Sequence, residues 1–169
     1  MSSAAPHAAV VSPLSDYTKE YIVSWLTSLL PLVHIVGLAL GVGSASAKLT
    51  LLLKARSDQA FVPAYIAASR PITRLIILGM VLLTLSGIGW LLLGYTFTPL
   101  LITKLILVAA LWGLGPVIDN AIEPKFKALA PQEGESPSQA FIHAQQRYLL
   151  FEVLATGLFY AIIVLWMLG

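Results

Sequence analysis

Two ionisable side chains lie inside long apolar runs of this 169-residue chain, and they are the residues best suited to chemistry. His34 lies in the run from Leu29 to Leu53, and Lys104 lies near the start of the run from Pro99 to Ile118. Polar and charged groups inside a bilayer are costly and usually face a cavity or another helix. An imidazole so placed can ligate haem iron or a metal ion, and an ammonium group can pair with a propionate, a carboxylate or another anion.

Both residues also have a purely structural interpretation. His34 can hydrogen-bond to a neighbouring helix, and Lys104 can extend its ammonium group to the membrane surface. The two runs are predicted to enter the membrane from the same side, which places each residue about 7–9 Å below that surface at about 1.5 Å per residue. We therefore expect His34 and Lys104 to share a layer.

Small residues follow His34 on the same face of the predicted helix. Gly37 and Gly41 form a G-x-x-x-G pair, and Lys48 repeats the position of His34 after two further heptads. Such a face usually lets another helix backbone approach closely, and it would equally leave room for a flat macrocycle. Ser86, in the second apolar run, is a further candidate to line the interior.

Charged residues of both signs gather near the other ends of the predicted helices. We expect them to form mainly a structural clamp, because opposite charges at one depth relieve each other's desolvation. A proton pathway is the alternative. The set consists of Lys48, Arg74, Asp119 and Glu152.

The residue inventory narrows the chemistry further. With no cysteine, the chain has no disulfide, thiolate ligand or covalent haem attachment. His7 and His143 are predicted to lie outside the spans, so a haem at His34 would be five-coordinate, take a methionine or lysine, or bridge two copies of His34. Motifs for nucleotide hydrolysis, metalloprotease and esterase chemistry are absent from the sequence.

The composition is that of a membrane protein. Hydrophobic residues make up 58% of the chain and charged residues 11%, and the mean hydropathy is +0.87. No soluble core could absorb so many apolar side chains, so the lipid bilayer is the expected partner. A formal charge of +2 does not indicate nucleic-acid binding.

The apolar runs predict an all-α, integral membrane four-helix bundle in residues 29–169. Residues 1–28 are predicted to form an outer-side tail and an interfacial helix, with a break at Pro31 because proline removes a backbone hydrogen bond. The alternative is one long, kinked and tilted helix. The four spans are predicted at about 29–53, 71–95, 99–118 and 148–168.

Basic residues predict the orientation, because they concentrate in cytoplasmic loops. The two longer connections carry most of them, so these connections should be cytoplasmic and both termini should face outward. The basic residues in or beside these connections are Lys54, Arg56, Arg70, Arg74, Lys125, Lys127 and Arg147.

Three segments resemble a known group of membrane proteins. They are VHIVGLALGVGSASAKLTLLLKA, TLSGIGWLLL and LLITKLILVAALWG, which together cover most of the chain from Leu30 to Trp112. The pattern is similar to that of poorly characterised four-helix bacterial membrane proteins, of CopD-type copper-handling proteins and of HemJ-type protoporphyrinogen oxidases. The resemblance implies haem or porphyrin chemistry at His34 and Lys104.

The main hypothesis is therefore a multi-pass protein of the bacterial inner membrane that binds haem b or a porphyrin for electron transfer or haem handling. His34 is the expected axial ligand and Lys104 its charge partner, with Gly37, Gly41 and Ser86 beside them. One alternative is a cofactor-free subunit of a larger membrane complex, and another is copper binding or transport at His34. A homodimer or a larger complex is the expected assembly.

Overall fold

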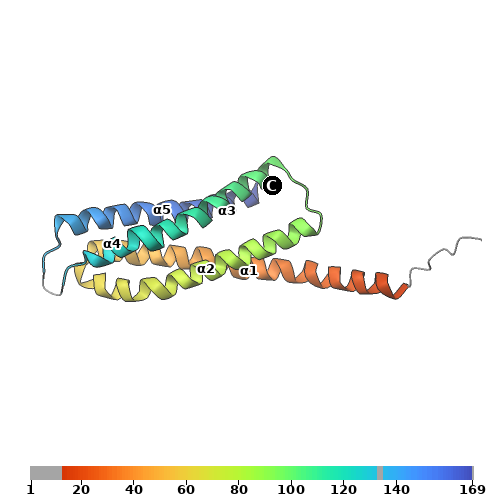
Figure 1. Cartoon of the computed structure of the whole chain (residues 1–169), viewed down its shortest axis with the longest axis horizontal. Coiled ribbons are helices and arrows are strands. Elements are labelled where there is room, and N and C mark those ends of the chain that lie inside the picture. The colour runs from red at the N-terminus through yellow and green to blue at the C-terminus, as the bar shows by residue number, and fades with distance from the viewer. Residues whose placement is uncertain (1–12, 133–134, 169) are drawn as a thin grey trace, which may run out of the picture.

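Helices and the turns between them make up the described part of the chain. The computed structural model describes residues 13–132 and 135–168. Four long helices, α1 (Pro13–Ser57), α2 (Val62–Leu92), α3 (Pro99–Val117) and α5 (Gln139–Met167), run up and down beside one another (Figure 1). Four helical segments are long and apolar enough to cross a membrane. The predicted all-α class and the multi-pass membrane character are thus confirmed.

Short capped turns reverse the chain. At the end of α1, the Asp58 side chain accepts a hydrogen bond from a backbone N–H at 3.2 Å and begins the 3₁₀ turn η1 (Gln59–Phe61). After α2, Gly94 adopts φ +92°, a conformation that other residues disfavour. Thr98 then caps α3 by accepting a backbone hydrogen bond at 3.1 Å. We call the end of the molecule with η1 and α4 the α4 end, and the opposite end the turn end.

Helix α3 does not stop where its apolar run stops. It continues through a π-helical segment, η2 (Ile118–Ile122), into the short helix α4 (Glu123–Ala128). The helices α2 and α5 also begin about nine residues before the predicted spans, at Val62 and Gln139. Hydropathy marks only the lipid-crossing part of a helix, whereas polar turns beyond it remain helical.

The predicted break at Pro31 is wrong, because α1 continues through this residue as one helix. Proline removes one backbone hydrogen bond, but a full break would free several more, and lipid offers no water to satisfy them. Helix α1 therefore crosses the predicted boundary at residue 29, and its N-terminal part extends beyond the other helices (Figure 1). The predicted tail, residues 1–12 with His7, lies outside the described residues.

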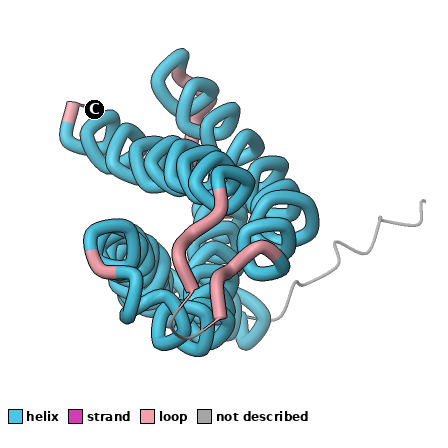
Figure 2. Tube along the Cα trace, turned by 90° about the vertical axis from the view of Figure 1, so that its left-hand side faces the viewer, coloured by secondary structure: helices cyan, strands magenta, loops and turns pink. Residues whose placement is uncertain are grey.

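The helices pack in two pairs that meet most closely at the α4 end. Helix α1 packs most extensively on α2, and α5 contacts both α1 and α3. Towards the turn end the α1–α2 pair and the α3–α5 pair move apart (Figure 1), and Figure 2 shows the same helices turned by 90°. One buried apolar cluster fills the α4 end, and it comprises Leu52, Ala55, Val62, Tyr65, Ile118, Ile122, Phe126, Phe141, Tyr148 and Leu149. A second lies nearer the middle, and it comprises Val42, Ala45, Met80, Leu111 and Phe159.

Candidate functional site

His34 lies between α1 and α2, towards the turn end. Its Nδ1 atom is 2.8 Å from the hydroxyl of Ser86, and its ring lies 4.9 Å, centroid to centroid, from that of Trp90. Ser86 is fully buried, and its hydroxyl also lies 2.8 Å from the backbone oxygen of Leu82 and 3.0 Å from that of Leu83. In the tautomer with the proton on Nδ1, His34 donates to Ser86, the Ser86 hydroxyl donates to the backbone, and the Nε2 atom keeps its lone pair.

The glycines that follow His34 pack against α2. A Cβ atom placed on Gly79 of α2 would lie 2.6 Å from the Cα atom of Gly41 and 2.8 Å from the backbone oxygen of Gly37. A Cβ atom on Gly37 would lie 3.0 Å from the backbone nitrogen of Leu83. The two helix backbones approach closely here, so α2 occupies the space beside Gly37 and Gly41 that a macrocycle would need.

Lys104 lies on α3, partly buried. Within residues 13–132 and 135–168 its ammonium group makes no hydrogen bond or ion pair. Helix α3 packs against α5 and makes no extensive contact with α1, which carries His34. The shared layer of His34 and Lys104 therefore stays a prediction.

The surroundings of His34 decide which metal centres its nitrogen suits. No group of three or more His, Asp or Glu side chains is placed to hold a metal ion in the part of the chain that the structure describes. The polar neighbours of His34 are the Ser86 hydroxyl and the Trp90 ring. A bare copper ion needs several donors from the protein, whereas haem iron brings four porphyrin nitrogens and needs only an axial ligand.

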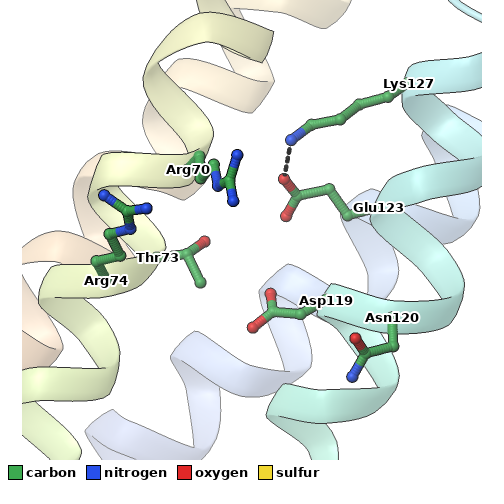
Figure 3. A pocket seen from close by; sticks show the side chains of 7 residues that line it. All are labelled: Arg70, Thr73, Arg74, Asp119, Asn120, Glu123 and Lys127. Carbon is green, nitrogen blue, oxygen red and sulfur yellow. Dashed lines mark ion pairs between the residues drawn. The ribbon is translucent and has the colours of Figure 1, made fainter.

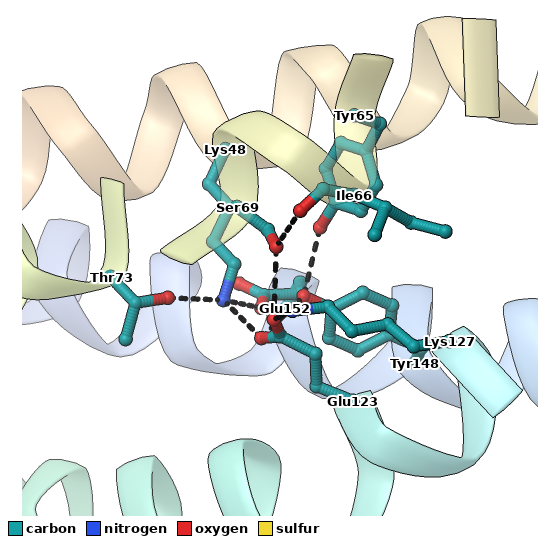
Figure 4. Close-up of polar contacts among 9 residues, drawn as sticks. All are labelled: Lys48, Tyr65, Ile66, Ser69, Thr73, Glu123, Lys127, Tyr148 and Glu152. Carbon is teal, nitrogen blue, oxygen red and sulfur yellow. Dashed lines mark hydrogen bonds and ion pairs between the residues drawn. The ribbon is translucent and has the colours of Figure 1, made fainter. Parts of the chain in front are cut away.

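A second polar site lies at the α4 end, and Lys48 is its centre (Figure 4). The Nζ atom of Lys48 is 2.8 Å from Glu152 Oε1, 3.0 Å from Glu123 Oε2 and 2.9 Å from the hydroxyl of Thr73. Lys48, Glu123 and Glu152 are only 2%, 6% and 3% exposed. The ammonium donates hydrogen bonds to Thr73 and Glu123 and forms an ion pair with Glu152, whose Oε1 atom has no hydrogen-bond partner among the described residues. We call these residues and their hydrogen-bonding partners the ionic cluster.

Four groups of the ionic cluster contact the carboxylate of Glu123. Besides Lys48, the hydroxyls of Ser69 and Tyr148 each donate to its carboxylate at 3.0 Å, and the ammonium of Lys127 lies 2.6 Å away. Tyr65 in turn donates a hydrogen bond to the Tyr148 hydroxyl at 2.8 Å. Every lone-pair direction of the buried carboxylate is therefore used, as a buried charge requires.

The predicted clamp is confirmed for Lys48 and Glu152, which form an ion pair. Sequence reasoning missed Glu123, because the third span was predicted to end at residue 118. The helix instead continues through η2, whose π geometry adds one residue to the turn and brings Glu123 to the interior. The available signal was that Glu123 lies four residues, about one helical turn, after Asp119.

The other two members of the predicted clamp line an open pocket beside the ionic cluster. The pocket has a volume of about 450 Å³ and lies between α2 and the η2–α4 segment (Figure 3). Arg74 makes no ion pair with Asp119 or with any other carboxylate of the described chain. The lining residues are Arg70, Thr73, Arg74, Asp119, Asn120, Glu123 and Lys127.

No protein-family model, no curated protein and no solved structure matches the chain. The resemblance to CopD-type and HemJ-type proteins therefore stays a prediction from the quoted segments.

Proposed function

We propose that the protein is an integral membrane four-helix bundle that binds haem b, or a related porphyrin, through His34 for electron transfer or haem handling. The observation that supports it is the hydrogen bond between His34 Nδ1 and the hydroxyl of Ser86, which has backbone acceptors of its own. Histidines that ligate metals commonly donate their other ring N–H to such a partner, which fixes the tautomer and the ring orientation.

His34 offers a nitrogen that can ligate haem iron, but the close packing of α1 and α2 restricts where a haem could bind. The Nε2 lone pair of His34 would ligate the haem iron, and haem would supply one-electron redox chemistry to the site. The close contact of Gly37 and Gly41 with Gly79 excludes a macrocycle from between α1 and α2. His34 would therefore hold a haem outside the contact of these glycines, and Lys104 is the proposed charge partner of a propionate.

Spectroscopy of the purified full-length protein tests this function. Protein from haem-replete cells is expected to show a Soret band at a fixed ratio to protein, and His34→Ala should abolish it. Ser86→Ala removes the partner of Nδ1 and should weaken haem affinity about 10–100-fold. His143→Ala, at an exposed histidine of α5, is the matched control and should leave the band unchanged. Colourless wild-type protein with native helicity would refute the proposal.

The membrane is proposed to be the bacterial inner membrane, with the α4 end in the cytoplasm and both chain ends outside. Support comes from the distribution of basic residues, because Lys54, Arg70 and Lys127 all lie towards the α4 end. The start of α1 and the end of α5 lie at the opposite end of the molecule (Figure 1).

A second candidate function is that of an accessory subunit of a larger membrane complex, and the length of α1 favours it. At 45 residues, α1 is about 68 Å long, more than twice the roughly 30 Å thickness of the hydrocarbon core. Its N-terminal part extends beyond the other helices (Figure 1). The aromatic residues Tyr17, Tyr21 and Trp25 of α1 are exposed. Purification in mild detergent tests this function, because stoichiometric larger subunits should co-elute and should be lost when Trp25 is replaced by Glu.

A further inference from the structure

Two arginines on consecutive turns of α2 face the open pocket at the α4 end. Arg70 and Arg74 are exposed, and neither forms an ion pair with a carboxylate of the described residues. Thr73 lies between them, and Asn120 and Lys127 line the pocket from the η2–α4 side (Figure 3). The pocket thus combines two guanidinium groups with neutral hydrogen-bond donors, which is a set that suits a phosphate oxygen.

The carboxylates near the pocket do not neutralise these arginines. Glu123 is saturated by Lys48, Lys127 and two hydroxyl donors. Asp119 is then the one acid of the pocket lining that has no ion pair within the described chain. The pocket and the ionic cluster together hold more positive than negative groups, with the cations Lys48, Arg70, Arg74 and Lys127 against the carboxylates Asp119, Glu123 and Glu152.

The depth of the pocket matches the phosphate layer of a bilayer. Residues 75–93 of α2 and the following turn contain no charged residue. At about 1.5 Å per residue this stretch is about 29 Å long, which is close to the roughly 30 Å thickness of the hydrocarbon core. Arg74 then lies at the edge of the hydrocarbon, and Arg70 lies about 6 Å further out, at the level of the lipid headgroups.

We propose that this pocket binds the phosphate group of an anionic phospholipid. Arg70 and Arg74 pair with the phosphate, and Thr73 and Asn120 donate hydrogen bonds to it. Basic pockets between membrane helices bind anionic headgroups in this way. Asp119 opposes the binding, because its carboxylate lies in the same pocket. Free inorganic phosphate shares the chemistry, and the position of the pocket at headgroup depth favours the lipid.

Lipid selectivity of the full-length protein tests the proposal. The protein is reconstituted into nanodiscs of phosphatidylcholine with a minor fraction of phosphatidylglycerol, and the lipids that stay bound are counted by native mass spectrometry. Phosphatidylglycerol should be enriched, and Arg70→Gln and Arg74→Gln should each lower the enrichment about fivefold. Arg147→Gln, at an exposed arginine of α5 outside the pocket, is the matched control and should change nothing.

Asp119→Asn provides a test of opposite sign, because removing the competing carboxylate should raise the enrichment about fivefold. Circular dichroism and size-exclusion elution confirm that each variant is folded. Equal enrichment in Arg70→Gln, Arg74→Gln and Arg147→Gln would overturn the proposal, and so would a loss of enrichment in Asp119→Asn.

Inorganic phosphate is titrated in parallel, to distinguish a lipid headgroup from free phosphate as the ligand. Displacement of phosphatidylglycerol by phosphate would overturn the assignment to a lipid, and no displacement would support it.

Discussion

Glu123 shows how a buried charge is accommodated in this protein. Its carboxylate is shared between two ammonium groups and two hydroxyls, which come from four different helices. Glu152 instead has Lys48 as its one cation among the described residues. Breaking a buried ion pair costs more than the pair contributes, because one charge is left uncompensated. The ionic cluster therefore couples α1, α2, α4 and α5 through Lys48.

Replacing Lys48 is expected to destabilise the protein strongly. Lys48→Met leaves Glu152 buried without a cation, and it should lower the free energy of unfolding by about 3–5 kcal/mol. Unfolding in mixed micelles with increasing dodecyl sulfate measures this change. Lys54→Met is the control, because the Lys54–Asp58 pair is largely exposed and should contribute at most about 1 kcal/mol.

The double variant Lys48→Met with Glu152→Leu tests the cause of the loss. It removes both charges of the pair, and it should recover most of the stability, since apolar residues commonly replace buried ion pairs without loss. Equal stability of Lys48→Met and Lys54→Met would contradict this account of the ionic cluster.

At the scale of the elements, the glycines set how closely α1 and α2 pack. Gly79 meets Gly41 and Gly37 backbone to backbone, and His34 lies on the same side of α1, against Ser86 of α2. The distance between the two helices therefore also sets the hydrogen bond that fixes the imidazole. The G-x-x-x-G pattern predicted close packing, but the residue that it meets, Gly79, had no signal in the sequence of α1.

A methyl group at Gly79 should force α1 and α2 apart. Gly79→Ala places its Cβ atom against the backbone of Gly41, and overpacking of this kind should cost about 1–3 kcal/mol of stability. Gly113→Ala on α3 is the matched control. Its added Cβ atom meets nothing within 4 Å, so higher helix propensity should leave stability unchanged or raise it by up to about 1 kcal/mol. Thermal melts that shift equally for the two variants would contradict the close approach.

Element ends were the least predictable part of the fold. Long apolar runs, each with a single charged residue, located each lipid-crossing helix, because the bilayer selects for them. Because the third run was taken to end the helix, Glu123 was not predicted to face the interior. It follows that run by five residues but stays on the helix through the π turn η2. At Pro31 a helix end was predicted where α1 continues. A proline that breaks a helix in water is tolerated in a membrane helix.

At the scale of the whole molecule, most of the basic residues gather at one end. Most of the basic residues and both longer connections lie towards the α4 end, whereas the turn end exposes Tyr95 and Phe97. The partner of each charged residue could not be predicted, because pairing depends on how the helices are rotated. For example, Arg74 and Asp119 were predicted to belong to the clamp, but they line the open pocket instead.

The orientation can be measured with single cysteines, because the natural chain contains none. Thr96→Cys, in the turn between α2 and α3, should react with an impermeant maleimide in intact spheroplasts. Ser136→Cys, in the connection between α4 and α5, should react only after the membrane is permeabilised. The reverse pattern of labelling would contradict the proposed cytoplasmic position of the α4 end.

The most direct measurement is ligand rescue at position 34. His34→Gly removes the imidazole and keeps a short residue beside Ser86 and Trp90, so added imidazole can occupy the vacated space. His34→Gly is expected to lose the Soret band of the wild-type protein, and imidazole in the buffer is expected to restore it. A wild-type spectrum in His34→Gly without imidazole would contradict His34 as the axial ligand.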